Sequence, residues 1–202
     1  MGAAGAARRG VVRRGDVRIR RAEGRDAGRL TRLVRSSRAY EGRYASMVAG
    51  YRVGPDYIEA HRVFVAVEEI PGDEGPGERV LGFYSLLVEA AELDLMFVSD
   101  QAQGYGIGRR LVEHMRGEAR RAGMGGVRVV SHPPAEGFYL SVGARPVGTV
   151  PAYPPAVLWD RPELVFPVVS EVPAVPAVPV VPVVPELPAV PVVPVADGGA
   201  GE

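Results

Sequence analysis

Residues 103–108, Gln-Gly-Tyr-Gly-Ile-Gly, are the part of the sequence whose residue types most directly indicate chemistry. They follow a mostly apolar run at 93–98 and precede Leu111, Val112 and Met115, which recur at helical spacing. We therefore expect a strand that leads through a glycine loop into a helix. Such a junction is where backbone N–H groups most readily bind a phosphate.

Three classes of phosphate-binding loop contain glycines in this way, and the residues separate them. A P-loop needs Gly-Lys followed by Ser or Thr, and all 24 basic side chains of this chain are arginines. A dinucleotide-binding loop needs a small residue where this sequence has Arg109 or Leu111. It also needs an acid after the next strand, where Ser131-His132 follows instead. The P-loop is excluded, and nicotinamide binding is disfavoured.

Other kinds of site are limited by composition. The chain has no cysteine, so a disulfide framework, a cysteine-ligated zinc site and a thiol nucleophile are excluded. His61, His114 and His132 lie far apart in the sequence and show no ligand spacing. We expect no metal site.

The elements that must position the loop follow from hydrophobic periodicity and from turn residues. Strands are expected at 16–21, 63–67, 80–88, 93–98, 127–130, 147–150 and 164–166, and helices at 26–35, 55–60, 106–122 and 133–143. Glycines and prolines at 71–77 predict a hairpin, and the helix between strands 93–98 and 127–130 predicts one parallel pairing. The fold class is α/β, with a mixed, mostly antiparallel sheet flanked by helices.

Asp26 and the residues from Ser36 to Gly54 are less regular. Asp26 is expected to cap the first helix, whose arginines form one face. Tyr40, Tyr44, Met47 and Tyr51 are spaced as on a helix. They form either core packing for a second short helix or the walls of a substrate pocket.

The domain organisation predicted from composition has three parts. Residues 1–15 form a flexible basic arm, residues 16–168 form the domain, and residues 169–202 form a disordered or polyproline II tail. In the tail, proline occupies every third position from Pro173 to Pro194, which is the repeat of polyproline II. The tail is either a semi-rigid extension or a ligand for a proline-recognising protein partner.

At the glycine loop the sequence resembles the GCN5-related N-acetyltransferase (GNAT) superfamily. Gln103, Gly106 and Gly108 match the acetyl-CoA loop of that family, and residues 135–144 resemble its later Phe-Tyr, Gly-Phe segment. The resemblance covers about residues 17–168. It implies a GNAT-like fold, acetyl-CoA as cosubstrate, and direct attack of an amine on the acetyl group in a ternary complex.

The resemblance also implies the residues that hold acetyl-CoA. Glycines let the loop backbone approach the pyrophosphate, and the helix dipole with Arg109 or Arg110 complements its charge. Phe97 and Val98 match the end of the strand whose main chain pairs with pantetheine. The predicted cofactor-binding residues are Phe97, Val98, Gln103, Gly104, Tyr105, Gly106, Ile107, Gly108 and Arg109.

Two catalytic roles follow from the same resemblance. Glu92 stands where some members carry a general base, and Asp94 would share its face in a regular strand. Tyr139 matches the tyrosine that protonates the departing thiolate in many members. The sequence departs from the family at Pro134, where relatives often carry an asparagine that bonds the cofactor.

The sequence therefore predicts an N-acetyltransferase that uses acetyl-CoA and a primary amine. The alternative is a non-catalytic acyl-CoA-binding module whose proline-rich tail recruits a partner. No apolar run is long enough to span a membrane and no signal sequence is recognisable, so a cytoplasmic location is expected. Nucleic-acid binding through the arginine-rich first helix is disfavoured, and the acceptor and the oligomeric state, a homodimer included, are left open.

Overall fold

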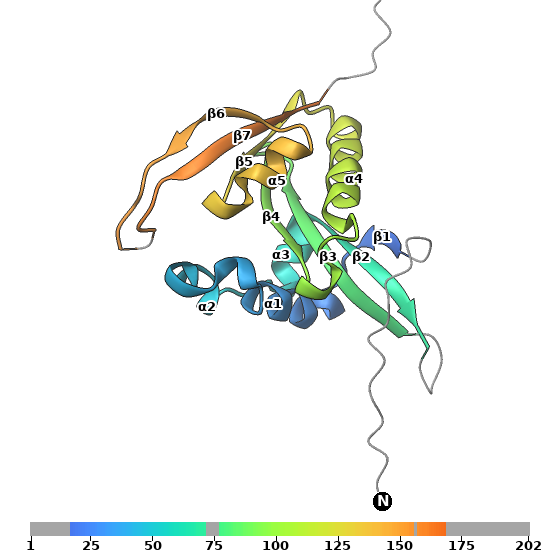
Figure 1. The fold of residues 1–202 in the computed structure, drawn as a ribbon. Coiled ribbons are helices and arrows are strands. Elements are labelled where there is room, and N and C mark those ends of the chain that lie inside the picture. Colours follow the sequence, from blue (N-terminus) through green and yellow to red (C-terminus); the bar gives the residue numbers. More distant parts are fainter. Residues whose placement is uncertain (1–16, 72–76, 156, 169–202) are drawn as a thin grey trace, which may run out of the picture. The chain divides into compact units, whose positions relative to one another are not determined.

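The computed structural model describes residues 17–71, 77–155 and 157–168. Figure 1 shows this part of the chain as a twisted sheet with helices on both sides. The predicted basic arm at 1–15 and the predicted tail at 169–202 lie outside the described residues. No described helix has the length and apolar character needed to cross a membrane.

The sheet has seven strands in the order β1-β2-β3-β4-β5-β7-β6. The strands are β1 (Val17–Arg21), β2 (Arg62–Ile70), β3 (Gly77–Leu87), β4 (Glu92–Val98), β5 (Gly126–Val130), β6 (Arg145–Val150) and β7 (Arg161–Pro167). All neighbouring pairs are antiparallel except β4 and β5, which are parallel. The predicted mixed sheet, the β2–β3 hairpin and the single parallel pairing are confirmed.

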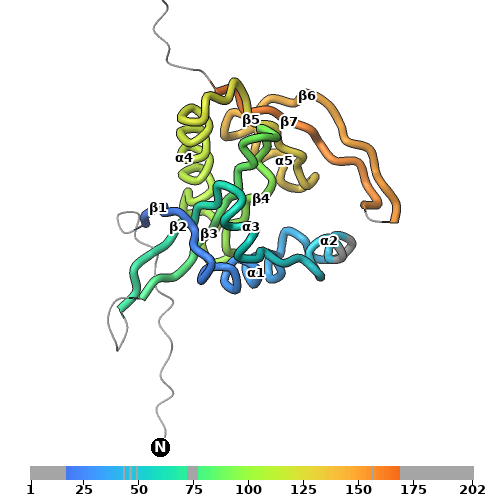
Figure 2. The backbone as a smooth tube through the Cα atoms, turned by 180° about the vertical axis from the view of Figure 1, so that it is seen from behind, coloured from blue at the N-terminus to red at the C-terminus, as the bar shows by residue number. Residues whose placement is uncertain are grey.

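The helices divide between two hydrophobic cores. They are α1 (Ala27–Arg35), α2 (Ser46–Ala49), α3 (Pro55–Ala60), α4 (Ile107–Arg121) and α5 (Glu136–Ser141). Side chains of α1, α2 and α3 pack with β2, β3 and β4 in one core, and those of α4 and α5 pack in the other. Figures 1 and 2 show α1, α2 and α3 gathered on one side, away from α4.

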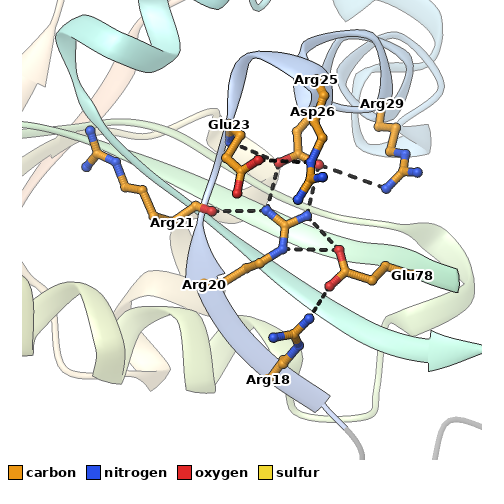
Figure 3. A network of polar contacts seen from close by, with 8 residues as sticks. All are labelled: Arg18, Arg20, Arg21, Glu23, Arg25, Asp26, Arg29 and Glu78. Carbon is orange, nitrogen blue, oxygen red and sulfur yellow. Dashed lines mark hydrogen bonds and ion pairs between the residues drawn. The ribbon is translucent and has the colours of Figure 1, made fainter. Parts of the chain in front are cut away.

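Asp26 stands at the predicted cap position of α1, but the predicted capping hydrogen bond is wrong. Asp26 precedes α1 but bonds none of its N–H groups. Its carboxylate accepts hydrogen bonds from the Arg20 guanidinium, at 2.7 and 3.0 Å, and from the Glu23 N–H at 3.0 Å. A buried carboxylate is stabilised more by a charged donor than by a neutral amide, and Figure 3 shows Arg20 between Asp26 and Glu78.

Residues 36–54 form no continuous second helix. They fold into 3-10 turns at Arg38–Tyr40 and Gly42–Tyr44, followed by the four-residue α2. Gly42 has a φ of +67°, which interrupts the helical path between them. Tyr44 is buried in the protein, whereas Tyr40 lines the cleft described below. The aromatic residues of this segment therefore contribute both to core packing and to a cleft wall.

A β-bulge in β4 decides where its side chains point. Ser85 of β3 faces Leu95, but the next residue, Leu86, faces Leu93, so Asp94 is the extra residue. The Leu95 N–H donates to the Ser85 hydroxyl at 3.0 Å. The regular alternation that would place Glu92 and Asp94 on one face is therefore interrupted between them.

Candidate active site

A cleft opens beside β4 and β5, which face each other at a single pair in the described sheet, Glu92 and Arg128. Its volume is about 570 Å³. Its walls come from the turn before α2, β4, the glycine loop, the start of α4, the end of β5 and α5. They include Ser37, Ala39, Tyr40, Asp94, Phe97, Val98, Gln103, Gly104, Gly106, Ile107, Gly108, Arg109, His132, Pro134, Phe138 and Tyr139.

The glycine loop brings the N-terminus of α4 to this cleft. Gly104 and Gly106 have φ values of +80° and +81°, in the left-handed region that favours glycine. The Arg110 N–H is the first to bond within the helix, to the Gly106 carbonyl oxygen at 3.1 Å. The N–H groups of residues 107–109 therefore point out of the helix end, where they and the helix dipole favour an anion.

Gly108 is needed for a different reason. A Cβ atom there would lie 2.9 Å from the ring of Phe138 on α5, closer than Cβ atoms normally approach. The missing side chain lets α5 pack against the first turn of α4. This contact closes one wall of the cleft.

The remaining predicted loop residues lie differently. Gln103 lines the cleft, and its Nε2 donates to Asp100 Oδ1 at 3.1 Å. Arg109 also lines the cleft. Ile107 is 2% exposed because its side chain packs in the core, so it offers the cleft its backbone. Tyr105 is an exposed residue outside the cleft walls.

Phe97 and Val98 form the β4 wall. Phe97 is buried, with its ring stacked on Phe83 at 5.8 Å and on Tyr40 at 5.6 Å between centroids. Val98 is half-buried. The Phe97 side chain therefore belongs to the core, and the strand offers the cleft its backbone edge together with Val98.

Tyr139 projects from α5 toward the same cleft. Its ring is buried against Phe138 and Phe166, with centroids at 5.3 and 6.1 Å. Burial, helped by the nearby Tyr40 phenol, raises the pKa of Tyr139 above its usual value. The phenol therefore stays protonated at neutral pH.

Glu92 lies outside the cleft walls. Its carboxylate accepts a hydrogen bond from Arg128 Nη1 at 2.6 Å, and Arg128 Nε donates to Glu163 at 2.5 Å. These contacts join β4, β5 and β7. The structure thus brings the loop, Phe97, Val98 and Tyr139 to one cleft but leaves Glu92 and Tyr105 out of its walls.

Asp94 is the carboxylate that lines the cleft. It accepts a hydrogen bond from the Tyr57 phenol of α3, and the Tyr57 oxygen lies 2.6 Å from the Ser85 hydroxyl. Burial and the bond to Asp94 raise the pKa of Tyr57 well above its usual value, so the phenol remains neutral. The sequence already made Asp94 a candidate, because it follows Glu92 by two residues. The β-bulge between the two residues could not be predicted from the sequence.

Two cleft residues carry roles that sequence reasoning missed. His132 stacks on Tyr40 with centroids 4.3 Å apart, and its Nε2 donates to the Ala39 carbonyl oxygen at 2.8 Å. These contacts fasten the Arg38–Tyr40 turn to the end of β5. The sequence offered Tyr40 as core packing or as a pocket wall, but no local signal pairs it with a histidine 92 positions further along the chain.

The class of protein follows from a comparison with family models. Residues 59–143 match the model described as an acetyltransferase (GNAT) domain. The match runs from the end of α3 to Gly143, two residues after α5, and so contains β4, the glycine loop and Tyr139. This part of the chain is therefore similar to a GNAT acetyltransferase domain. A search of curated proteins gives no match.

Solved structures resemble the whole domain. A GCN5-related N-acetyltransferase from Rhodopseudomonas palustris has a TM-score of 0.60 and 15% identity, over 78% of this chain and 99% of its own. YncA from Salmonella typhimurium, determined with its cofactor acetyl-CoA, has a TM-score of 0.55 and 18% identity, over 77% and 95%. The ribosomal-protein-S18-alanine N-acetyltransferase from Escherichia coli has a TM-score of 0.52 and 18% identity, over 75% and 94%. The predicted GNAT-like fold is confirmed.

Proposed function

We propose that this protein transfers the acetyl group of acetyl-CoA to a primary amine by direct attack in a ternary complex. The observation that carries the proposal is that one cleft contains both the glycine loop at the α4 N-terminus and the protonated phenol of Tyr139. The likeness to YncA, which was determined with acetyl-CoA, supports the choice of cosubstrate. The likeness to an alanine N-acetyltransferase supports an amine acceptor.

The cleft residues fit acetyl-CoA. The outward N–H groups of residues 107–109 would hold the pyrophosphate, with Arg109 adding charge. No atom lies within 4 Å of a Cβ built on Gly104 or Gly106, so the loop leaves open space beside its backbone. The β4 backbone at Phe97 and Val98 would accompany the pantetheine arm. Gln103 would orient the loop through Asp100.

Acetyl-CoA supplies the acetyl group as a thioester when it is bound. Tyr139 would then donate its phenolic proton to the departing sulfur and recover one from solvent. For the proton lost by the amine, we propose Asp94 over Glu92. Asp94 lines the cleft, whereas the Glu92 carboxylate is held by Arg128. Glu92→Gln and Asp94→Asn, measured side by side, decide between the two carboxylates.

The test of the transfer reaction is Tyr139→Phe. We expect thiol release from acetyl-CoA to fall about 100-fold, because a positioned general acid contributes about that much or more. Binding of coenzyme A, measured by calorimetry, should stay within about twofold. Tyr153→Phe is the matched control, since Tyr153 is 74% exposed and lies outside the cleft walls.

An unchanged rate in Tyr139→Phe would remove the acid role. If no amine in a broad panel releases thiol while coenzyme A binds tightly, the protein is instead the non-catalytic acyl-CoA-binding module. The cytoplasmic location and a partner for residues 169–202 stay predictions from the sequence.

A further inference from the structure

Among the described residues, no arginine forms an ion pair with the cleft carboxylate of Asp94. Its hydrogen-bond donor is the neutral phenol of Tyr57, and no basic side chain within the described ranges forms an ion pair with it. The acids outside the cleft walls differ, because Glu92 and Glu163 share Arg128. A carboxylate left with neutral partners favours a cation as its neighbour.

The phenols near Asp94 add no positive charge. Burial, and to a lesser extent the Asp94 carboxylate, raises the pKa of the Tyr51 phenol to about 12, so Tyr51 is neutral. Burial also raises the pKa of Tyr40, whose ring is covered by His132 and Phe97. The Asp94 carboxylate therefore lies near phenols that stay neutral.

Arginines of the described segments around the cleft have other partners. Arg38, on the turn that lines the cleft, lies 3.7 Å from Asp100 and 3.9 Å from Glu41. Arg35 donates through Nε to the Tyr51 carbonyl oxygen at 3.0 Å. Arg109 stands at the loop, where the proposed function assigns it to the cosubstrate. A carboxylate on the acceptor would meet Asp94 without a cation to balance it.

We propose that Asp94 selects the acceptor by charge, so that the preferred substrates are cationic amines that carry no carboxylate beside the amino group. This inference rests on the proposed function for its substrate, but the site can be tested by binding alone. The protonated amine binds Asp94 first, with Tyr57 holding the carboxylate in place. An α-amino acid places its own carboxylate next to the reacting amine, so it is repelled.

The test uses pairs that differ in one carboxylate beside the amine: tyramine against tyrosine, and phenethylamine against phenylalanine. In the wild-type protein, kcat/KM for thiol release should be at least tenfold higher for the amine of each pair. The same order should appear in calorimetric binding to the protein saturated with coenzyme A, where no transfer occurs. In Asp94→Asn, the binding ratio within each pair should fall at least threefold.

Asp56→Asn is the control for the loss of one negative charge. Asp56 is exposed on α3, next to Tyr57 in sequence but outside the cleft walls, and its ratios should match the wild type. Equal or tighter binding of the amino acids in the wild type would overturn charge selection. So would an unchanged ratio in Asp94→Asn.

The two proposals fail in different ways. Thiol release with no preference between the members of a pair removes charge selection and leaves the transferase intact. Preferential binding of the amines without any thiol release removes the transferase and leaves a cation site at Asp94. Absence of amine binding to the protein with coenzyme A overturns the site.

Discussion

Single residues of the loop are constrained by different forces. Gly104 and Gly106 are constrained by their own backbone, which lies in the left-handed region. Gly108 is constrained by a neighbour, since a Cβ there would lie 2.9 Å from the Phe138 ring. The same residue type thus marks a turn at two positions and a helix contact at the third.

This difference predicts the effect of Gly108→Ala. The added methyl group must displace Phe138, so we expect a loss of about 1–3 kcal/mol in the free energy of unfolding. Because Phe138 also lines the cleft, the KM for acetyl-CoA should rise several-fold. Urea denaturation and initial-rate kinetics measure the two effects.

Gly117→Ala is the control within the same helix. A Cβ at Gly117 would meet only the end of the Arg121 side chain, at 3.7 Å. Alanine should stabilise α4 there by up to about 1 kcal/mol. Equal stability of the two variants would contradict the packing role of Gly108.

At the scale of elements, Arg20 joins three parts of the fold. It lies on β1, bonds Asp26 at the start of α1, and bonds Glu78 on β3 at 2.7 Å (Figure 3). The side chain of Asp26 is fully buried and that of Arg20 is 15% exposed. The pair therefore fixes how α1 leaves the sheet, and α1 leads into the turn that lines the cleft.

Asp26→Asn should weaken this junction. It leaves Arg20 largely buried with one carboxylate fewer, and removal of one partner of a buried pair costs about 3 kcal/mol. The free energy of unfolding, measured in urea, should fall by about that amount. Asp56→Asn, which changes an exposed carboxylate, should stay within about 0.5 kcal/mol of the wild type. A similar loss in both variants would show that Asp26 has no special role.

The same junction predicts the pH dependence of stability. Burial alone would raise the pKa of Asp26, but the hydrogen bonds from Arg20 and the Glu23 N–H lower it below its usual value. The hydrogen bond from Arg20 likewise lowers the pKa of Glu78, against the effect of burial. This stabilisation is fully present above the unfolded pKa values of about 4 and is lost as pH falls through the lower folded values.

The free energy of unfolding of the wild type should therefore decline below about pH 4. In Asp26→Asn the decline should be shallower, because one of the shifted carboxyls is gone. Parallel curves for the two proteins would contradict the assignment to Asp26.

At the scale of the whole molecule, the chain divides after Ser170 into two units. All the cleft walls come from residues 37–142, and the last described strand ends at Pro167. We therefore expect a chain that ends at Ser170 to bind coenzyme A and to release thiol within about twofold of the full chain. The melting temperature would verify that the shortened protein is folded. A tenfold loss of either activity would mean that residues 171–202 take part in the reaction.

Much of this protein was predictable because its signals are local. The hairpin, the strand before the glycine loop and the apolar face of α4 each depend on residues a few positions apart. The broken path from Ser36 to Gly54 was not predictable, because Gly42 interrupts a spacing that looked helical. The contact of Asp26 was also missed, since its partner Arg20 lies on a strand whose position depends on β2.

By itself, the sequence determined that a strand, a glycine loop and a helix follow one another at 92–121, and that the loop suits a phosphate. It also supplied Glu92, Asp94 and Tyr139 as candidates for proton transfer. Only the tertiary structure decided which of these line the cleft. Asp94 lines the cleft because a β-bulge opposite Ser85 interrupts the alternation of β4. Glu92 does not line the cleft because the pairing of β4 with β5 brings Arg128 to its carboxylate. Both are contacts between strands, and no pattern within one strand encodes them.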